Sequence, residues 1–250
     1  MRAYLSAAMV LALTVPAGAA PLTVERVPEA DALVRSLDPG RNYGHAGGLS
    51  VSGSAALNRR GEQMGLLDTF LRFDAGPLVG AFDAAFGEGG WLLQGAVLRL
   101  TEQGSPNNPI FNRGVGRFEV RWIAEDAWAE GTGNPRGPTT DGVAWDDKPW
   151  LLDAFSDVTL GEYTNRGEDG ELALELGLPE ELRADVLAGG DVSLLFTAVD
   201  DTVGFTFNSK DIAPPRLPPR LEVTADVIPE PATAALLGLG LAAVARRRRR

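Results

Sequence analysis

The side chains best suited to binding an ion lie in one long Gly- and Pro-rich segment, Glu130 to Trp150. Within it, Asp141, Asp146 and Asp147 surround Trp145. Carboxylate oxygens are the ligands that Ca²⁺ prefers, so these acids form a candidate calcium site, although their spacing is not that of an EF-hand loop. The alternative is an acidic loop whose carboxylates are simply solvated. Both interpretations remain open from the sequence.

Three aromatic side chains are candidates for contact with a sugar ring: Tyr43, Trp128 and Trp145. An aromatic face suits the axial C–H groups of a pyranose, provided that the ring is exposed to solvent. The competing interpretation is that Trp128 and Trp145 are buried and anchor their loops to the core. Exposure decides between the two, and the sequence does not reveal it.

Enzyme signatures are weak. The chain has no cysteine and a single histidine, His45, which excludes a thiol nucleophile and a two-histidine zinc site within the chain. It also lacks the G-x-S-x-G elbow of the serine hydrolases. A pair of carboxylates that cleaves glycosides is compatible with its 34 acidic residues, but their number alone proves nothing. We therefore expect a protein without catalytic residues.

The net charge of the chain limits which binding partners are expected. The chain of 250 residues carries 34 acidic against 23 basic residues, a formal net charge of −11. Such a surface repels nucleic acid and anionic lipid, so no nucleic-acid partner is expected, and it suits divalent cations. Without cysteine, an exported domain must rely on its core or on metal instead of disulfides.

The middle of the chain has the period of β-strands. In Gly116–Ala124, Phe118, Val120 and Trp122 alternate with charged residues, and Gly95–Glu102 alternates in the same way. Similar short runs lie at 49–51, 69–73, 172–176, 192–199, 204–207 and 220–224. Many short strands between glycine-rich loops predict an all-β fold, an antiparallel β-sandwich or jelly roll.

One short helix is expected, over Leu178–Gly190. Pro179 suits its first position, and Leu182, Val186 and Leu187 would form an apolar stripe. We expect this helix to cover an open end or an edge of the sandwich.

The first 20 residues have the layout of a secretory signal peptide. A short basic start precedes a mostly apolar run, Ala3 to Val15, and small residues follow it. We therefore expect residues 1–20 to form a signal helix that is removed on export.

The last residues also have three parts. Pro229, Glu230 and Pro231 precede an apolar run over 232–245, which as a helix is about 21 Å long, short for a bilayer core of about 30 Å. The chain then ends in arginines: Arg246, Arg247, Arg248, Arg249 and Arg250. These would stay on the cytoplasmic side of a membrane helix.

This layout resembles the PEP-CTERM sorting signal, over residues 227–250. The resemblance implies that the segment holds an exported protein transiently at the inner membrane, and that an exosortase-type transpeptidase then removes it. Pro229, Glu230 and Pro231 would be the recognition motif, a substrate for processing and not a catalytic site. Family members occur where exopolysaccharide is made.

The region between the two ends, residues 25–226, resembles the DNRLRE (disaggregatase-related) modules. The resemblance rests on the order of "NYGHAGGLSV", "FLRFD", "LQGAVLRL", "WAEGTG", "DGVAWDD" and "FNSKDIAPPRLPPRLEVT". It implies a β-sandwich of the carbohydrate-binding-module kind in a secreted or cell-surface protein. The stretch between "FLRFD" and "LQGAVLRL" is longer here than the family pattern leads us to expect.

The sequence thus predicts an exported protein that ends at the cell surface or in the extracellular matrix. It would bind extracellular polysaccharide without catalysis, with calcium as a candidate cofactor. The alternatives are a structural matrix protein with no specific ligand, which would bury its tryptophans, and an enzyme that degrades polysaccharide.

Overall fold

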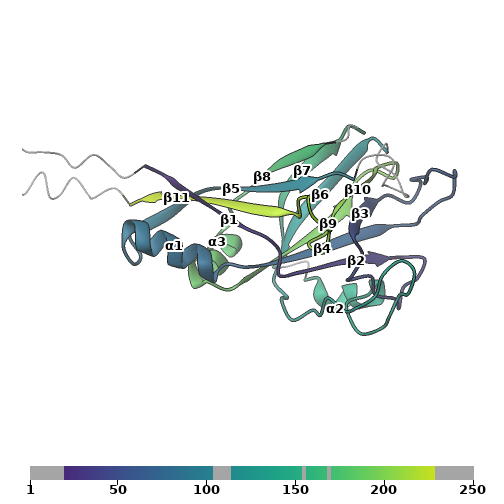
Figure 1. Ribbon diagram of the computed structural model, residues 1–250, viewed down its shortest axis with the longest axis horizontal. Helices are drawn as coiled ribbons and strands as arrows, with labels where there is room; N and C mark the ends of the chain where they lie inside the picture. The colour runs from purple at the N-terminus through teal and green to yellow at the C-terminus, as the bar shows by residue number, and fades with distance from the viewer. Residues whose placement is uncertain (1–19, 104–113, 154–155, 168–169, 229–250) are drawn as a thin grey trace, which may run out of the picture.

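The computed structural model describes residues 20–103, 114–153, 156–167 and 170–228. Two antiparallel sheets face each other, as predicted, with three short helices at their margins (Figure 1). The strands are β1 (Leu22–Arg26), β2 (Ala30–Arg35), β3 (Gly48–Ser52), β4 (Leu67–Asp74), β5 (Trp91–Thr101), β6 (Gly116–Ile123), β7 (Val158–Asn165), β8 (Glu171–Leu176), β9 (Asp191–Ala198), β10 (Gly204–Asn208) and β11 (Arg220–Val227).

The sheets differ in size. The smaller has the order β1-β11-β5-β8, and the larger has the order β10-β3-β4-β9-β6-β7, with β2 paired to β4 beside this path. In the smaller sheet, Leu22 of β1 lies opposite Ala225 of β11. The first and last strands of the fold are therefore neighbours, and the described chain enters and leaves at the same end of the sandwich (Figure 1).

The main core lies between the two sheets. Phe118, Val120 and Trp122 of β6 point into it, which confirms the face predicted from their alternation. Three phenylalanines from two strands, β6 and β10, form its centre: the ring centroids of Phe118 and Phe205 are 4.6 Å apart, and that of Phe207 lies 5.9 Å from that of Phe205. Burial of such large apolar side chains is the main favourable contribution to this fold.

Three strands, β1, β2 and β7, were not expected. Strand β2 is buried on both faces, so its sequence ADALVR shows no alternation of apolar and polar residues. It also contains an acid, Asp31, which is 0% exposed. Period-two patterns identify strands with one solvent-facing side, and β2 has none.

The prediction of a single helix was wrong. The expected helix is α3 (Glu180–Ala188), which begins after Pro179 and buries Leu182 and Val186, but Leu187 is 54% exposed. The structure adds α1 (Gly76–Phe86), α2 (Lys148–Leu151) and a 3-10 turn, η1 (Trp145–Asp147).

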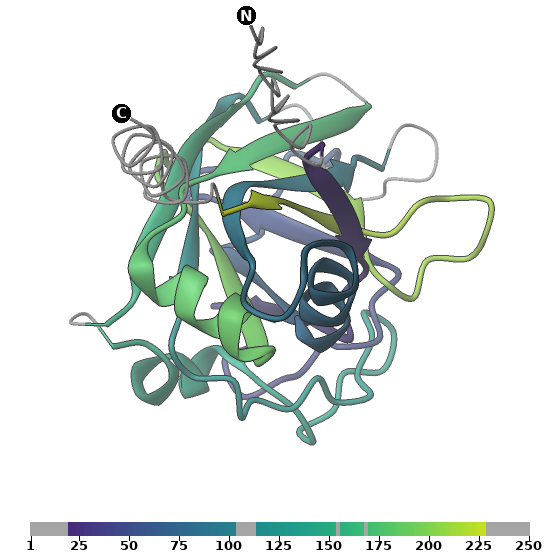
Figure 2. The same cartoon turned by 90° about the vertical axis from the view of Figure 1, so that its left-hand side faces the viewer.

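Helix α1 accounts for the long stretch after "FLRFD". It buries Leu78 and Phe82, one turn apart, and Phe86 in the next turn packs against the same core. Helices α1 and α3 lie side by side at the end of the sandwich where the termini emerge (Figure 2). The expectation that α3 covers an open end is confirmed.

A second, smaller core lies on the outer face of the larger sheet. There the long segment 124–153, which we call the covering segment, packs on β2 and β4 below the sheet in Figure 1. Its buried members include Trp128, Val143 and Leu151, which contact Phe70 and Leu195 of the sheet. The larger sheet is therefore covered on both faces.

Two predicted elements lie outside the described residues: the membrane helix of the tail, and the signal helix of residues 1–20 except for residue 20. The same holds for Pro229, Glu230 and Pro231 and for the arginines 246–250. Among the described helices, none has the length and apolar character needed to cross a membrane.

Candidate binding surface and metal centre

Trp128 anchors the covering segment. Its side chain is 2% exposed, its ring lies 5.7 Å from that of Phe70, and its Nε1 donates a hydrogen bond to Ser193 Oγ at 3.0 Å. The guanidinium of Arg72 lies 4.9 Å from the ring centroid and donates to the Trp128 backbone carbonyl at 2.8 Å. The ring has no face free for a sugar, so Trp128 is a loop anchor and not a stacking residue.

Tyr43 is buried as well. It is 7% exposed and belongs to the main core, and its hydroxyl donates to Asp38 Oδ2 at 2.9 Å. Burial and this carboxylate together raise the pKa of the Tyr43 hydroxyl. Its ring is therefore also unavailable for stacking.

The exposed aromatic surface lies on η1 and α2. Trp145 is half-buried, with the Lys148 ammonium 4.0 Å from its ring centroid, and the same ammonium pairs with Asp68 of β4. Trp150, which the sequence analysis did not select, is 58% exposed. Its Nε1 donates to Asp147 Oδ1 at 3.2 Å, so a hydrogen bond holds the indole while more than half of the residue stays exposed.

The predicted calcium ligands do not converge. Asp141 accepts hydrogen bonds from Thr132 Oγ1 at 2.7 Å and Thr139 Oγ1 at 2.5 Å, which lower its pKa to about 2. Asp147 accepts from the Ala144 amide at 2.8 Å, and Asp146 is exposed. Two of these carboxylates thus hold the covering segment in shape, and within the described chain the three do not form a metal-binding group.

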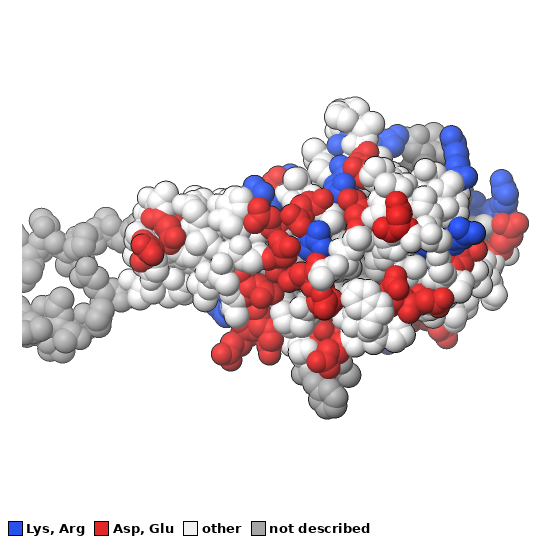
Figure 3. All heavy atoms as spheres, turned by 90° about the horizontal axis from the view of Figure 1, so that it is seen from below, with Lys and Arg blue, Asp and Glu red and all other residues white. Residues whose placement is uncertain are grey.

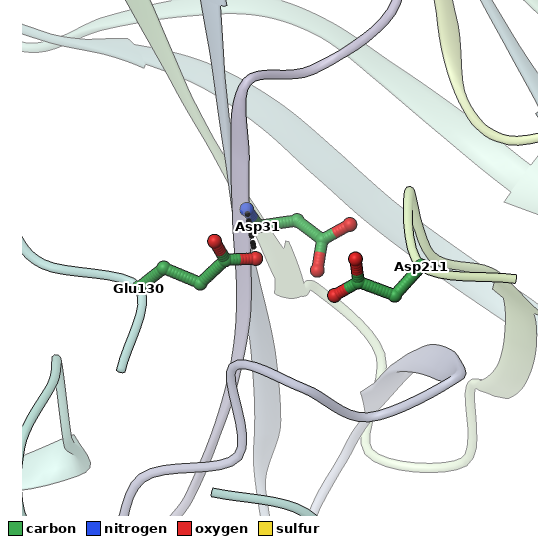
Figure 4. A group of neighbouring side chains, drawn as sticks. All are labelled: Asp31, Glu130 and Asp211. Carbon is green, nitrogen blue, oxygen red and sulfur yellow. Dashed lines mark hydrogen bonds between the residues drawn. The ribbon is translucent and has the colours of Figure 1, made fainter. Parts of the chain in front are cut away.

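A different set of acids does converge. One carboxylate oxygen from each of Asp31, Glu130 and Asp211 lies within 4.8 Å of the others, a group that we call the acidic cluster. Figure 4 shows the three carboxyl groups pointing toward one another from β2, from the covering segment and from the loop after β10. Oxygens this close can share one cation.

Lys210 is the basic partner of this cluster. Its Nζ lies 2.9 Å from Glu130 Oε1 and 3.1 Å from Asp211 Oδ1, and its backbone amide donates to Asp31 Oδ2 at 2.6 Å. Burial raises the pKa of the Asp31 carboxyl to about 8, because charge is costly away from water. Sequence analysis missed Asp31, whose only signal is an acid inside an apolar run.

Asn42 positions Glu130. Its Nδ2 donates to the backbone carbonyls of Glu130 at 2.6 Å and Val143 at 2.9 Å, and its Oδ1 accepts from the Gly44 amide at 3.0 Å. A Cβ on Gly44 would lie 2.0 Å from the Glu130 carbonyl oxygen, so this close approach requires glycine. The Asn-Tyr-Gly turn therefore locks the covering segment at the residue that enters the acidic cluster.

We expect Asn42→Ala to lower the free energy of unfolding by about 2–4 kcal/mol, because buried peptide groups lose their partners. Urea unfolding measures this. Asn58→Ala is the matched control, because Asn58 also bonds several groups of its own turn but is partly exposed. Equal losses in the two variants would contradict the proposed role of Asn42.

A polar cavity borders the loop after β10. It has a volume of about 250 Å³ and is lined by Thr101, Glu102, Gln103, Asn208, Pro215, Arg216 and Leu217. Among the described residues that line it, Glu102 supplies the one carboxyl group.

The decisive comparison concerns the tail. Residues 227–250 match the PEP-CTERM protein-sorting motif. The motif implies an exported protein that is transiently anchored in the membrane and processed by an exosortase. None of the curated proteins matches the chain. The DNRLRE resemblance of residues 25–226 stays a hypothesis.

The PEP-CTERM motif begins where the fold ends. Val227 is both the last residue of β11 and the first residue of the motif. Since β11 lies between β1 and β5, the motif continues directly from an internal strand of the smaller sheet. In the described part of the chain, no linker therefore separates the sandwich from the sorting signal.

Proposed function

We propose that the PEP-CTERM-tagged chain is the precursor of an exported, non-catalytic domain that binds extracellular polysaccharide at the cell surface or in the matrix. The main support for polysaccharide binding is the exposed indole of Trp150 on the covering segment. A solvent-exposed aromatic ring fixed by a hydrogen bond loses little conformational freedom when a sugar packs on it.

The charge of the face around Trp150 limits which polysaccharides can bind there. Acidic side chains are spread over the face that bears α2, and basic ones are fewer (Figure 3). A polyanion would be repelled unless cations bridged the two. We therefore propose a neutral polysaccharide, or an anionic one bridged by divalent cations.

The two alternatives have less support. A structural protein without a ligand would bury its tryptophans; Trp91, Trp122 and Trp128 are buried, but Trp150 is not. An enzyme needs paired carboxylates that a substrate can reach, and the acidic cluster includes Asp31, which is 0% exposed. Release of reducing ends from a polysaccharide would nevertheless identify the enzyme.

Trp150→Ala is expected to weaken polysaccharide binding at least tenfold, because a stacking aromatic contributes about 1.4 kcal/mol or more. The measurement is retention on a glycan array with and without calcium. Leu187→Ala is the control, because it removes an equally exposed apolar side chain from α3. If no glycan is retained by the unaltered protein under either condition, the binding role is refuted and the structural alternative is favoured.

A further inference from the structure

The acidic cluster contains a carboxylate oxygen that the protein leaves without a partner. Asp31 is fully buried, and while its Oδ2 accepts the Lys210 amide, its Oδ1 has no hydrogen-bond partner among the described residues. A buried oxygen without a donor costs about 1–3 kcal/mol, more for a charged group. An unpaired buried oxygen in a folded protein requires an explanation, and a bound ion is one such explanation.

The geometry around the Asp31 carboxyl group suits a metal ion. Calcium binds oxygens at about 2.3–2.6 Å, so two of its ligands lie no more than about 5 Å apart. The 4.8 Å limit that encloses one oxygen each from Asp31, Glu130 and Asp211 falls within this distance. Figure 4 shows that Asp31 and Asp211 face each other while Glu130 enters from a third element.

The cluster holds three carboxyl groups but a single ammonium. Lys210 Nζ contacts Glu130 and Asp211, whereas Asp31 accepts only the backbone amide of Lys210. The side chains of Lys210 and Glu130 are each 18% exposed, and that of Asp211 is 36% exposed. An ion can therefore enter from the Asp211 side as the flexible lysine side chain moves out.

We propose that Asp31, Glu130 and Asp211 form a binding site for one divalent cation, with calcium as the best fit, which takes the place of the Lys210 ammonium. The ion would join β2, the covering segment and the loop after β10 at a single point. This site differs from the acids around Trp145 and does not depend on polysaccharide binding.

The test uses the full chain, purified in a mild detergent and freed of metal with EDTA. Isothermal titration with CaCl₂ should give one bound ion per chain. Asp31→Asn should lower the affinity at least tenfold, whereas Asp146→Asn, which removes an exposed acid of the same covering segment, should leave it unchanged. Lys210→Met should bind at least tenfold more tightly, because no ammonium has to be displaced.

If Asp31→Asn fails to fold, the tighter calcium binding expected of Lys210→Met still tests the proposal. Absence of stoichiometric binding in both the unaltered chain and Lys210→Met would overturn the proposal. Binding by Lys210→Met alone would overturn it for the native chain, because the lysine would then be the permanent cation. Equal losses in Asp31→Asn and Asp146→Asn would mean that calcium binds the acidic surface without a defined site.

Discussion

Replacing Pro229, Glu230 and Pro231 together with alanine is expected to abolish processing of the exported chain. The unaltered chain should lose its tail in a host that contains an exosortase, and the variant should keep its full mass and remain in the membrane fraction. We expect this because the three residues would be the recognition motif of the transpeptidase, while β11 ends at Val227, so the change leaves the sheet intact. Intact mass and membrane fractionation measure both effects.

Two controls distinguish the loss of motif recognition from a general disruption of the tail. Thr233→Ala alters the tail outside Pro-Glu-Pro and should be processed normally. A host without the exosortase should retain the tail on every variant. If the unaltered chain keeps its tail in both hosts, the segment is a permanent anchor, and the export of a free matrix protein is refuted.

Trp128→Ala is expected to have the largest effect on stability, a loss of about 3–5 kcal/mol. The substitution leaves a cavity beneath the covering segment and removes the ring contacts with Phe70 and Arg72 and the hydrogen bond to Ser193. Because a small domain has only about 5–15 kcal/mol in total, a large part of its stability would be lost. Urea unfolding of the full chain gives the value.

Trp150→Ala is the matched control, because it removes the same side chain from the exposed side of the same segment. Its effect on unfolding should stay within about 0.5 kcal/mol. Limited proteolysis should also cut Trp128→Ala faster between residues 124 and 153, since the segment loses its anchor. Similar losses in the two variants would disprove the distinction between anchor and exposed ring.

Some predicted elements have a pattern that reports a single solvent-facing side. The alternation in β6 and the stripe of Leu182 and Val186 in α3 are of this kind. The sequence analysis did not predict β2, where apolar residues and Asp31 are buried on both faces. Local periodicity carries no signal when a second layer, here the covering segment, buries the outer face.

The candidate sites were less predictable because they depend on exposure and on distant residues. Trp128 and Trp150 belong to the same segment and have the same chemistry, and only the packing of the segment distinguishes them. Asp141, Asp146 and Asp147 are close in sequence, but Asp141 and Asp147 bond their own segment and Asp146 is exposed. Asp31 and Asp211 come together only when β2 and the loop after β10 are in place.

The pairing of β1 with β11 has a consequence for the order of folding. Thr23 and Thr224, whose hydroxyls meet across this pair, are 201 positions apart along the chain. A ribosome makes β1 well before β11, so the smaller sheet stays incomplete until β11 has been synthesised. Contacts this distant form slowly. The topology therefore delays completion of the sandwich, and such a delay is compatible with the export that the PEP-CTERM motif implies.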